Sequence, residues 1–222
     1  AVSDSAAEYV RSLTDEPVEI VPNGVDLERF IAPRKKATNE KKSILYLGRL
    51  EKRKGVDYLL SAYARLRETH DDVQLVIGGK GVKRKSLERT VEQYEIPDVT
   101  FTGFIAEEDK VALLANADVY CSPALYGESF GIVLLEAMAV GTPIVAGNNP
   151  GYASVMTGTG RMSLVNPKST EDFAQRLEML LYEEEVRSLW RKWAKDAVEQ
   201  YRFDVVADAY EAVYKKAMKV YA

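Results

Sequence analysis

The feature that most constrains the fold is a regular alternation of short apolar runs and longer amphipathic stretches from residue 43 onward. The apolar runs have the length of buried strands, and the stretches between them have helical periodicity. Such alternation is typical of a parallel sheet with helices on both faces and right-handed crossovers. Strands are predicted at 44–47, 73–77, 99–104, 119–121 and 144–146, and helices at 56–68, 83–94, 107–115 and 130–140. We therefore predict an α/β fold.

The segments on either side of this region are simpler. Ser3 and Asp4 are suited to cap a helix that reaches residue 13, and an alternating run at 18–21 predicts a strand that ends at a turn, 22–24. Residues 161–167 predict an edge strand. Helices are predicted for the rest of the chain, at 169–183, 185–201 and from 203 to the end. Four aromatic residues recur there at helical spacing and are expected in the core: Trp190, Trp193, Tyr210 and Tyr214.

Composition excludes several classes of protein. The net charge of −4 gives no reason to expect nucleic acid as a partner. The one cysteine, Cys121, lies in a predicted strand, which excludes an internal disulfide framework and fits a reducing, cytoplasmic compartment. No apolar stretch approaches the roughly 18 residues of a membrane-spanning helix, and no signal peptide is evident. Residues 33–42 are polar and lysine-rich, so we expect a solvated linker, with contact to an anionic membrane surface as the alternative.

Two carboxylates stand out in the most apolar helical stretch. Ser129 is expected to cap a helix over 130–140, and Gly141 with Pro143 forms the stop signal. Glu128 precedes the cap and Glu136 lies in the helix. Glu136 comes eight positions after Glu128, which corresponds to a rise of roughly 12 Å along a helix at about 1.5 Å per residue. The free amides of the first helical turn lie between them and suit a phosphate.

This spacing has two interpretations. One carboxylate could bind hydroxyls on one side of a diphosphate and the other could bind hydroxyls on the far side, as a sugar–diphosphate–ribose ligand requires. Alternatively, Glu128 only complements the helix dipole and Glu136 is a satisfied polar residue of the core. The spacing alone does not separate the two.

The loops that leave the predicted strands carry the remaining candidates, because ligands of parallel sheets bind beyond the carboxyl ends of the strands. Arg49 and Lys54 follow the first strand and could neutralise a diphosphate. The glycine-rich loop 78–81 follows the second strand but matches neither the dinucleotide-binding nor the P-loop pattern, so a tight turn or a close approach by a nucleotide is expected.

A longer stretch of the sequence resembles a known family. Residues 117–123 and 127–139, together with the phrase at 22–26, resemble the E-x7-E region and domain entry of retaining family-4 glycosyltransferases, particularly the phosphatidyl-myo-inositol mannosyltransferases. The resemblance covers nearly the whole chain. It implies the C-terminal, donor-binding, Rossmann-like half of a GT-B fold. The domains it implies are an entry segment and linker (1–42), a nucleotide-sugar-binding domain (43–202) and a final helix (203–222) that packs on an N-terminal, acceptor-binding domain.

The resemblance also implies roles for residues. Arg49 and Lys54 would bind the diphosphate, Glu128 the sugar hydroxyls and Glu136 the ribose hydroxyls. Donor contacts from the helix start would come from Ser129, Phe130, Gly131, Ile132 and Val133. Ile105 would hold the base by its backbone, with Glu107 and Lys110 near the polar edge of a guanine. The alternative for Glu107 is that it only favours the N-terminus of the next helix.

The implied reaction is metal-independent, retaining hexosyl transfer from GDP-mannose to a lipid or glycan acceptor. No Asp-x-Asp motif is present, and His70, the single histidine, lies between a predicted helix and strand and is expected on the surface rather than in catalysis. The chain alone is therefore expected to bind nucleotide and transfer little or no sugar, with the full-length enzyme at the inner face of the membrane. The alternatives are a UDP-sugar donor, a non-catalytic nucleotide-sugar-binding module, or an epimerase-like or phosphorylase-like enzyme.

Overall fold

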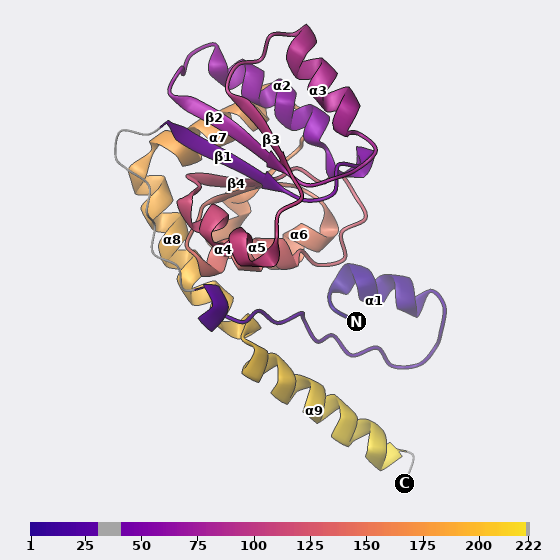
Figure 1. The fold of residues 1–222 in the computed structure, drawn as a ribbon. Coiled ribbons are helices and arrows are strands. Elements are labelled where there is room, and N and C mark those ends of the chain that lie inside the picture. The colour runs from indigo at the N-terminus through magenta and orange to yellow at the C-terminus, as the bar shows by residue number, and fades with distance from the viewer. Residues whose placement is uncertain (31–40, 221–222) are drawn as a thin grey trace.

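The computed structural model describes residues 1–30 and 41–220 and has a six-stranded sheet at its centre (Figure 1). The strand order is β3-β2-β1-β4-β5-β6, and each pair of neighbours runs parallel. The strands are β1 (Lys42–Leu47), β2 (Val73–Gly78), β3 (Val99–Gly103), β4 (Val119–Ser122), β5 (Ile144–Gly147) and β6 (Leu164–Val165). The predicted α/β fold with a parallel sheet is confirmed.

Helices cover both faces of the sheet, because successive residues of a strand point to opposite sides. Ile44 and Tyr46 of β1 face one core and Leu45 faces the other. The first face is covered by α2 (Val56–Arg67), α3 (Arg84–Gln93) and α7 (Thr170–Tyr182), and the second by α4 (Glu107–Asn116), α5 (Ile132–Ala139), α6 (Pro150–Val155) and α8 (Glu184–Val198). Figure 1 shows α2 and α3 on one side of the strands and α4, α5 and α6 on the other.

The strand order reverses between β1 and β4, and the loops that follow these two strands meet there. The amide of Leu125 donates to the carbonyl of Arg53 at 2.8 Å. Gly55 has a φ of 72°, and a Cβ at this position would lie 2.1 Å from the carbonyl oxygen of Pro123. Only glycine allows so close an approach in this left-handed conformation. The two loops are thereby held together at the switch point, where open α/β sheets bind ligands.

The glycine-rich loop after β2 serves backbone contact within the protein. Gly79 has a φ of 136°, and a Cβ there would lie 1.8 Å from the carbonyl oxygen of Gly48. The amide of Leu50 donates to the carbonyl of Lys80 at 2.9 Å. This loop therefore supports the loop after β1, which agrees with the tight turn expected from its glycines.

The start of the chain differs from the prediction. Helix α1 (Asp4–Arg11) ends earlier than residue 13 and carries the expected Ser3 cap. The strand predicted at 18–21 is wrong: the segment joins no sheet, and the amide of Val21 donates to the carbonyl of Ala1 at 2.8 Å. An alternating segment becomes a strand only where a sheet edge is available. A short 3-10 helix, Glu28–Phe30, follows, and residues 33–40 of the predicted linker lie outside the described part of the chain.

The predicted start of the carboxylate-bearing helix is also wrong. Helix α5 begins at Ile132 rather than Phe130, and Gly131, not Ser129, occupies the cap position with a φ of 115° and no side-chain cap bond. A Cβ on Gly131 would lie 2.8 Å from the ring of Tyr152. The chain therefore enters the helix through a left-handed glycine, because the buried tyrosine leaves no room for a side chain.

The C-terminal region is helical as predicted, apart from one short strand. A 3-10 helix (Gly158–Ser163) takes the first three residues of the predicted edge strand, and β6 has two residues. After α8, a 3-10 turn (Glu199–Tyr201) leads into α9 (Phe203–Val220), which projects from the body of the molecule (Figure 1). Among the described residues, no helix is long and apolar enough to cross a membrane.

The four aromatic residues expected in the core divide into two pairs. Trp190 is buried and donates to Ser163 Oγ at 2.7 Å, and Trp193 packs edge-on against it. Tyr210 and Tyr214 are exposed, by 39% and 65%, so the prediction is wrong for them. Helical periodicity identifies a common face but does not reveal whether another element covers that face.

Candidate functional site

Glu128 lies at the switch point and is held by two cations. Its Oε1 accepts from Lys54 Nζ at 2.8 Å and from Arg53 Nη1 at 2.6 Å. The Glu128 and Lys54 side chains are only 13% and 16% exposed. Lys54 and Glu128, two of the predicted site residues, are thus in direct contact. Because the contact is shielded from water, its attraction is screened less than that of a surface pair.

Arg49 lies at the rim of this cluster. Its guanidinium pairs with Glu51 at 3.0 Å, and its side chain is 67% exposed. The backbone is anchored, because its carbonyl accepts from the buried Tyr46 hydroxyl at 2.8 Å. Arg49 is therefore near Lys54 in the same loop, but the structure does not bring it to Glu128.

Arg53 is a member of the cluster that the sequence analysis missed. Besides Glu128, its guanidinium contacts Glu51 Oε2 at 3.2 Å and the carbonyl of Gly127 at 3.1 Å. Burial by itself would lower the pKa of Arg53, but the Glu128 and Glu51 carboxylates outweigh it and the pKa is raised. The available signal was the basic run at 52–54, of which only the last residue was selected.

The segment between the two carboxylates contributes backbone more than side chains. Phe130 is buried and packs edge-on against Tyr201, and the carbonyl of Ser129 accepts a hydrogen bond from Ser3 Oγ. Ile132 is partly exposed at the first turn of α5, and Val133 is half-buried. Helix α5 begins after Gly131, so its N-terminus directly follows the loop that carries Glu128. Its amides and dipole provide a positive end suited to an anion.

Tyr152 is a second residue that the sequence analysis did not select. Its hydroxyl shares a hydrogen bond of 2.7 Å with Ser122 Oγ, at the end of β4, and its ring lies against Gly131. Burial raises the pKa of the Tyr152 hydroxyl, and the nearby charge of Glu128 adds to the rise. The loop 147–152 was expected near a sugar, but nothing in its sequence singles out the tyrosine.

Glu136 lies further along α5 and is buried. Its Oε1 accepts from Lys110 Nζ at 2.7 Å, whereas Oε2 is buried and has no hydrogen-bond partner among the described residues. Burial raises the pKa of the Glu136 carboxyl, and Lys110 only partly opposes the rise. A buried acceptor of this kind is costly unless a donor reaches it. One oxygen of Glu136 therefore has hydrogen-bonding capacity that the described residues do not satisfy.

Lys110 joins Glu136 to the loop after β3. It also contacts Glu107 at 2.9 Å, and Glu107 contacts Arg29 at 3.0 Å. Burial would lower the pKa of Lys110, but Glu136 and Glu107 outweigh it and the pKa is raised. The Glu107 pKa is lowered, first by its hydrogen bond from Lys110 and also by Arg29. The structure thus brings together three predicted site residues, Lys110, Glu107 and Glu136, and Arg29 is an addition from a segment far away in the sequence.

Ile105 and His70 complete the predicted set. Ile105 is half-buried and its side chain fills the space above Gly78, where a Cβ would lie 2.9 Å from its Cγ1. His70 lies between α2 and β2, contacts Glu178 at 2.8 Å and stacks on Tyr182 with ring centroids 4.2 Å apart. Within residues 1–30 and 41–220, no group of three or more His, Cys, Asp or Glu side chains is placed to hold a metal ion.

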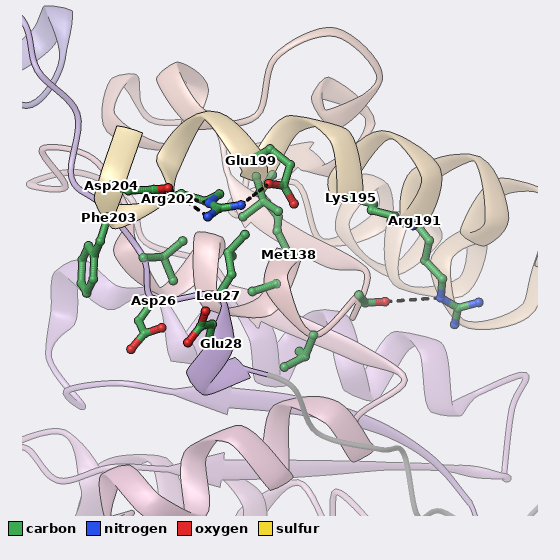
Figure 2. A pocket seen from close by; sticks show the side chains of 15 residues that line it. Asp26, Leu27, Glu28, Met138, Arg191, Lys195, Glu199, Arg202, Phe203 and Asp204 are labelled. Atoms are coloured by element: carbon green, nitrogen blue, oxygen red, sulfur yellow. Dashed lines mark hydrogen bonds and ion pairs between the residues drawn. The ribbon is translucent and has the colours of Figure 1, made fainter. Parts of the chain in front are cut away.

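A cavity of about 800 Å³ lies at the opposite end of α5 (Figure 2). Met138, Arg191 and Arg202 are among its lining residues, and neither Glu128 nor Glu136 is. Arg202 already pairs with Asp204 and Glu199, and Arg191 donates to the carbonyl of Gly141. We place the candidate site at the two glutamates instead, because the carboxyl ends of the strands meet there.

Proteins of similar sequence include named mannosyltransferases. The family described as glycosyl transferases group 1 matches residues 28–197. A phosphatidyl-myo-inositol mannosyltransferase of Mycobacterium leprae is 36% identical over 97% of this chain and 58% of its own length. An MMP alpha-(1->4)-mannosyltransferase of Mycolicibacterium hassiacum is 34% identical over 93% of this chain and 50% of its own length. This chain therefore spans little more than half the length of these relatives.

Solved structures share the fold. Sucrose-phosphate synthase of Thermosynechococcus elongatus has a TM-score of 0.85 at 24% identity, over 99% of this chain and 58% of its own. Anabaena HepE in complex with UDP-glucose has a TM-score of 0.84 at 19% identity, over 97% and 63%. The C-terminal domain of the group 1 protein LpcC from Francisella tularensis has a TM-score of 0.71 at 25% identity, over 81% of this chain and all of its own. The neighbours have the GT-B fold, and this chain belongs to the glycosyl transferases group 1 family.

Proposed function

We propose that this chain is the nucleotide-sugar donor-binding part of a retaining, metal-independent hexosyltransferase. The observation that carries the proposal is the pair of unlike carboxylates beside the N-terminal half of α5. Glu128 is held by two cations at the switch point, and Glu136 presents a buried, unpartnered oxygen. A ligand with hydroxyls at both ends and a diphosphate between them would satisfy the whole arrangement.

The diphosphate would lie at the N-terminus of α5. Lys54 and Arg49 follow β1 and would supply positive charge, together with the amides that begin at Ile132. During transfer, the bond from the anomeric carbon to the diphosphate oxygen would break, a bond to the acceptor oxygen would form and the acceptor hydroxyl would pass its proton to the leaving diphosphate. Negative charge grows on the leaving diphosphate, and these groups would stabilise it in the role that a metal plays elsewhere.

The nucleoside would lie toward Glu136. The unpartnered Oε2 would accept from a ribose hydroxyl. Ile105 would contact the base, and Glu107 and Lys110 would face its polar edge, a carboxylate matching the N–H donors of guanine and a lysine its carbonyl oxygen. We favour GDP-mannose because two relatives are named as mannosyltransferases. A UDP-sugar is the second candidate, because a neighbour of the same fold was solved with UDP-glucose.

The acceptor would bind to a domain outside this chain. The match covers 58% of the Mycobacterium leprae relative, so a large part of that protein has no counterpart here. On α9, Tyr210, Tyr214 and Met218 are exposed. An apolar face of this kind fits contact with a further domain. We expect the chain alone to bind the donor and to transfer little or no sugar. The full-length enzyme would act in the cytoplasm, at the inner face of the membrane where its acceptor is a lipid.

Calorimetric titration of the 222-residue chain with GDP and with UDP tests the proposal. The titration is run first without metal and then with magnesium. Metal-free binding with GDP preferred over UDP is the expected result. A preference for UDP would overturn the proposed base and sugar but keep the transferase class. Binding only with magnesium would overturn metal independence. Absence of binding to either nucleotide would contradict a donor site that is complete within this chain.

A further inference from the structure

Arg53 and Lys54 make the same contact in different ways. Both donate to the same atom, Oε1 of Glu128. Lys54 is an ammonium on a flexible stem that pairs with this oxygen. Arg53 uses a planar fork that contacts Glu128 and two further residues at once. The planar guanidinium of arginine loses less side-chain entropy per hydrogen bond than the flexible lysine side chain does. Arg53 is therefore better suited than Lys54 to remain bound to Glu128.

The contacts of Arg53 join the two loops of the switch point. Its Nη1 lies 3.1 Å from the Gly127 carbonyl and its Nε lies 3.2 Å from Glu51. Its own carbonyl accepts from the amide of Leu125 at 2.8 Å. Gly127 has a φ of 75°, which turns the loop so that its carbonyl reaches the guanidinium. Arg53 therefore ties the segment that carries Glu128 to the loop after β1, by side chain and backbone alike.

We propose that Arg53 is a positioning residue that keeps Glu128 aimed at the sugar when Lys54 turns to the donor diphosphate. The inference rests on the proposed function, in which Glu128 binds the sugar hydroxyls and Lys54 a phosphate. Lys54 cannot leave Glu128 at low cost unless another cation stays, because a carboxylate only 13% exposed would otherwise lie uncompensated near an anionic ligand. Arg53 is that cation.

This division of labour makes a distinct prediction for the two ends of the donor. Lys54 acts on the diphosphate, so its loss weakens a nucleoside diphosphate and a nucleotide sugar alike. Arg53 acts through Glu128 on the sugar, so its loss changes only the contribution of the sugar. Lysine at position 53 would keep the charge but not the fork, so it would restore the sugar contribution only in part.

The test is calorimetric titration of the 222-residue chain with GDP and GDP-mannose, or with UDP and UDP-glucose if the unchanged chain prefers UDP. The variants are Arg53→Met, Arg53→Lys and Lys54→Met. We expect Arg53→Met to change GDP affinity by less than about 3-fold and to weaken GDP-mannose relative to GDP by about 10-fold, the effect of one charge-assisted hydrogen bond. Arg53→Lys should fall between it and the unchanged chain, and Lys54→Met should weaken both ligands equally.

Two results would overturn the proposed role of Arg53 and leave the proposed function of the chain intact. Equal losses for both ligands in Arg53→Met would make it a phosphate ligand or a part of the general framework. No loss for either ligand would remove any link to the sugar. Thermal unfolding of each variant without ligand separates a loss of fold from a loss of contact. If the unchanged chain bound neither nucleotide nor nucleotide sugar, the proposed function would fail and this role with it.

Discussion

Glu128 and Glu136 are the same residue type eight positions apart, yet the fold treats them differently. Glu128 follows a left-handed glycine in a loop and has two cations on one oxygen. Glu136 lies on α5 and has one cation on one oxygen, and its other oxygen is buried without a partner among the described residues. Burial raises the pKa of Glu136. The charge of Glu128 is therefore neutralised by cations before a ligand binds, whereas Glu136 has an oxygen that the described residues leave without a hydrogen-bond donor.

The largest expected effect on binding concerns Lys54, which lies beside Glu128. Lys54→Ala should weaken GDP binding by about 10- to 100-fold, because a charge-assisted hydrogen bond contributes about 1.5–3 kcal/mol. Calorimetry with GDP measures it. Lys52→Ala is the matched control, since Lys52 belongs to the same 3-10 turn but its side chain is exposed. Equal losses in the two variants would reduce the effect to general electrostatics.

The Lys110→Met variant tests the Glu136 end of the site by its effect on the stability of the fold. It should lower the free energy of unfolding by about 1–3 kcal/mol at pH 7, because Glu136 would remain buried without its cation. The folded-state pKa of Glu136 is already raised and would rise further, so the penalty should be full above that pKa and shrink as the pH falls through it.

Urea denaturation at pH 7 and at pH 5 measures this effect. The double variant Lys110→Met with Glu136→Leu should recover most of the loss, because it removes the unpaired charge together with its partner. A penalty that grows on acidification would show that the ion pair is not its source.

A smaller effect concerns the Glu136 oxygen that has no donor among the described residues. Glu136→Gln should weaken GDP binding by about 10-fold at neutral pH, since a neutral amide is a weaker acceptor for a ribose hydroxyl than a carboxylate. Because the Glu136 pKa is raised, the ratio of the two affinities should begin to shrink above the ordinary glutamate value of 4.5 as the pH falls. Taking the ratio at each pH cancels the titration of the phosphates. A constant ratio would mean that the carboxylate does not titrate in this range or does not contact the ligand.

The smallest effect separates Arg49 from Lys54. Arg49→Ala should weaken GDP by only about 3- to 5-fold, because this side chain is 67% exposed and its interactions are screened. Titrations at low and high salt should show a larger salt dependence for Arg49 than for Lys54. Unchanged GDP affinity in both Arg49→Ala and Lys54→Ala would remove the proposed phosphate site.

Much of this site was predictable because its signals are local. Hydrophobic periodicity identified the strands of the sheet, and the rule that ligands bind beyond strand ends selected the loops that carry Arg49, Lys54 and Lys110. The E-x7-E resemblance added Glu128 and Glu136. The structure brings Lys54 to Glu128 and Lys110 to Glu136, two contacts that those patterns did not specify.

The rest depended on contacts between distant segments. Arg29 reaches Glu107 across 78 positions and Arg53 reaches Glu128 across 75, and no local pattern in the sequence indicates either pairing. The start of α5 moved to Ile132 because the ring of Tyr152 occupies the space beside Gly131. Tyr214 is exposed because the described part of the chain does not cover that face of α9.

The sequence by itself determined the order of strands and helices and the loops that carry charge, since periodicity and turn chemistry act over a few residues. The tertiary structure decided which cation serves which carboxylate. That choice depends on how closely two loops approach, and here Gly55 against the carbonyl of Pro123 sets the approach. It also decided that Glu136 would be buried with one oxygen unpartnered, because burial is a property of everything packed around a residue and not of the residue itself.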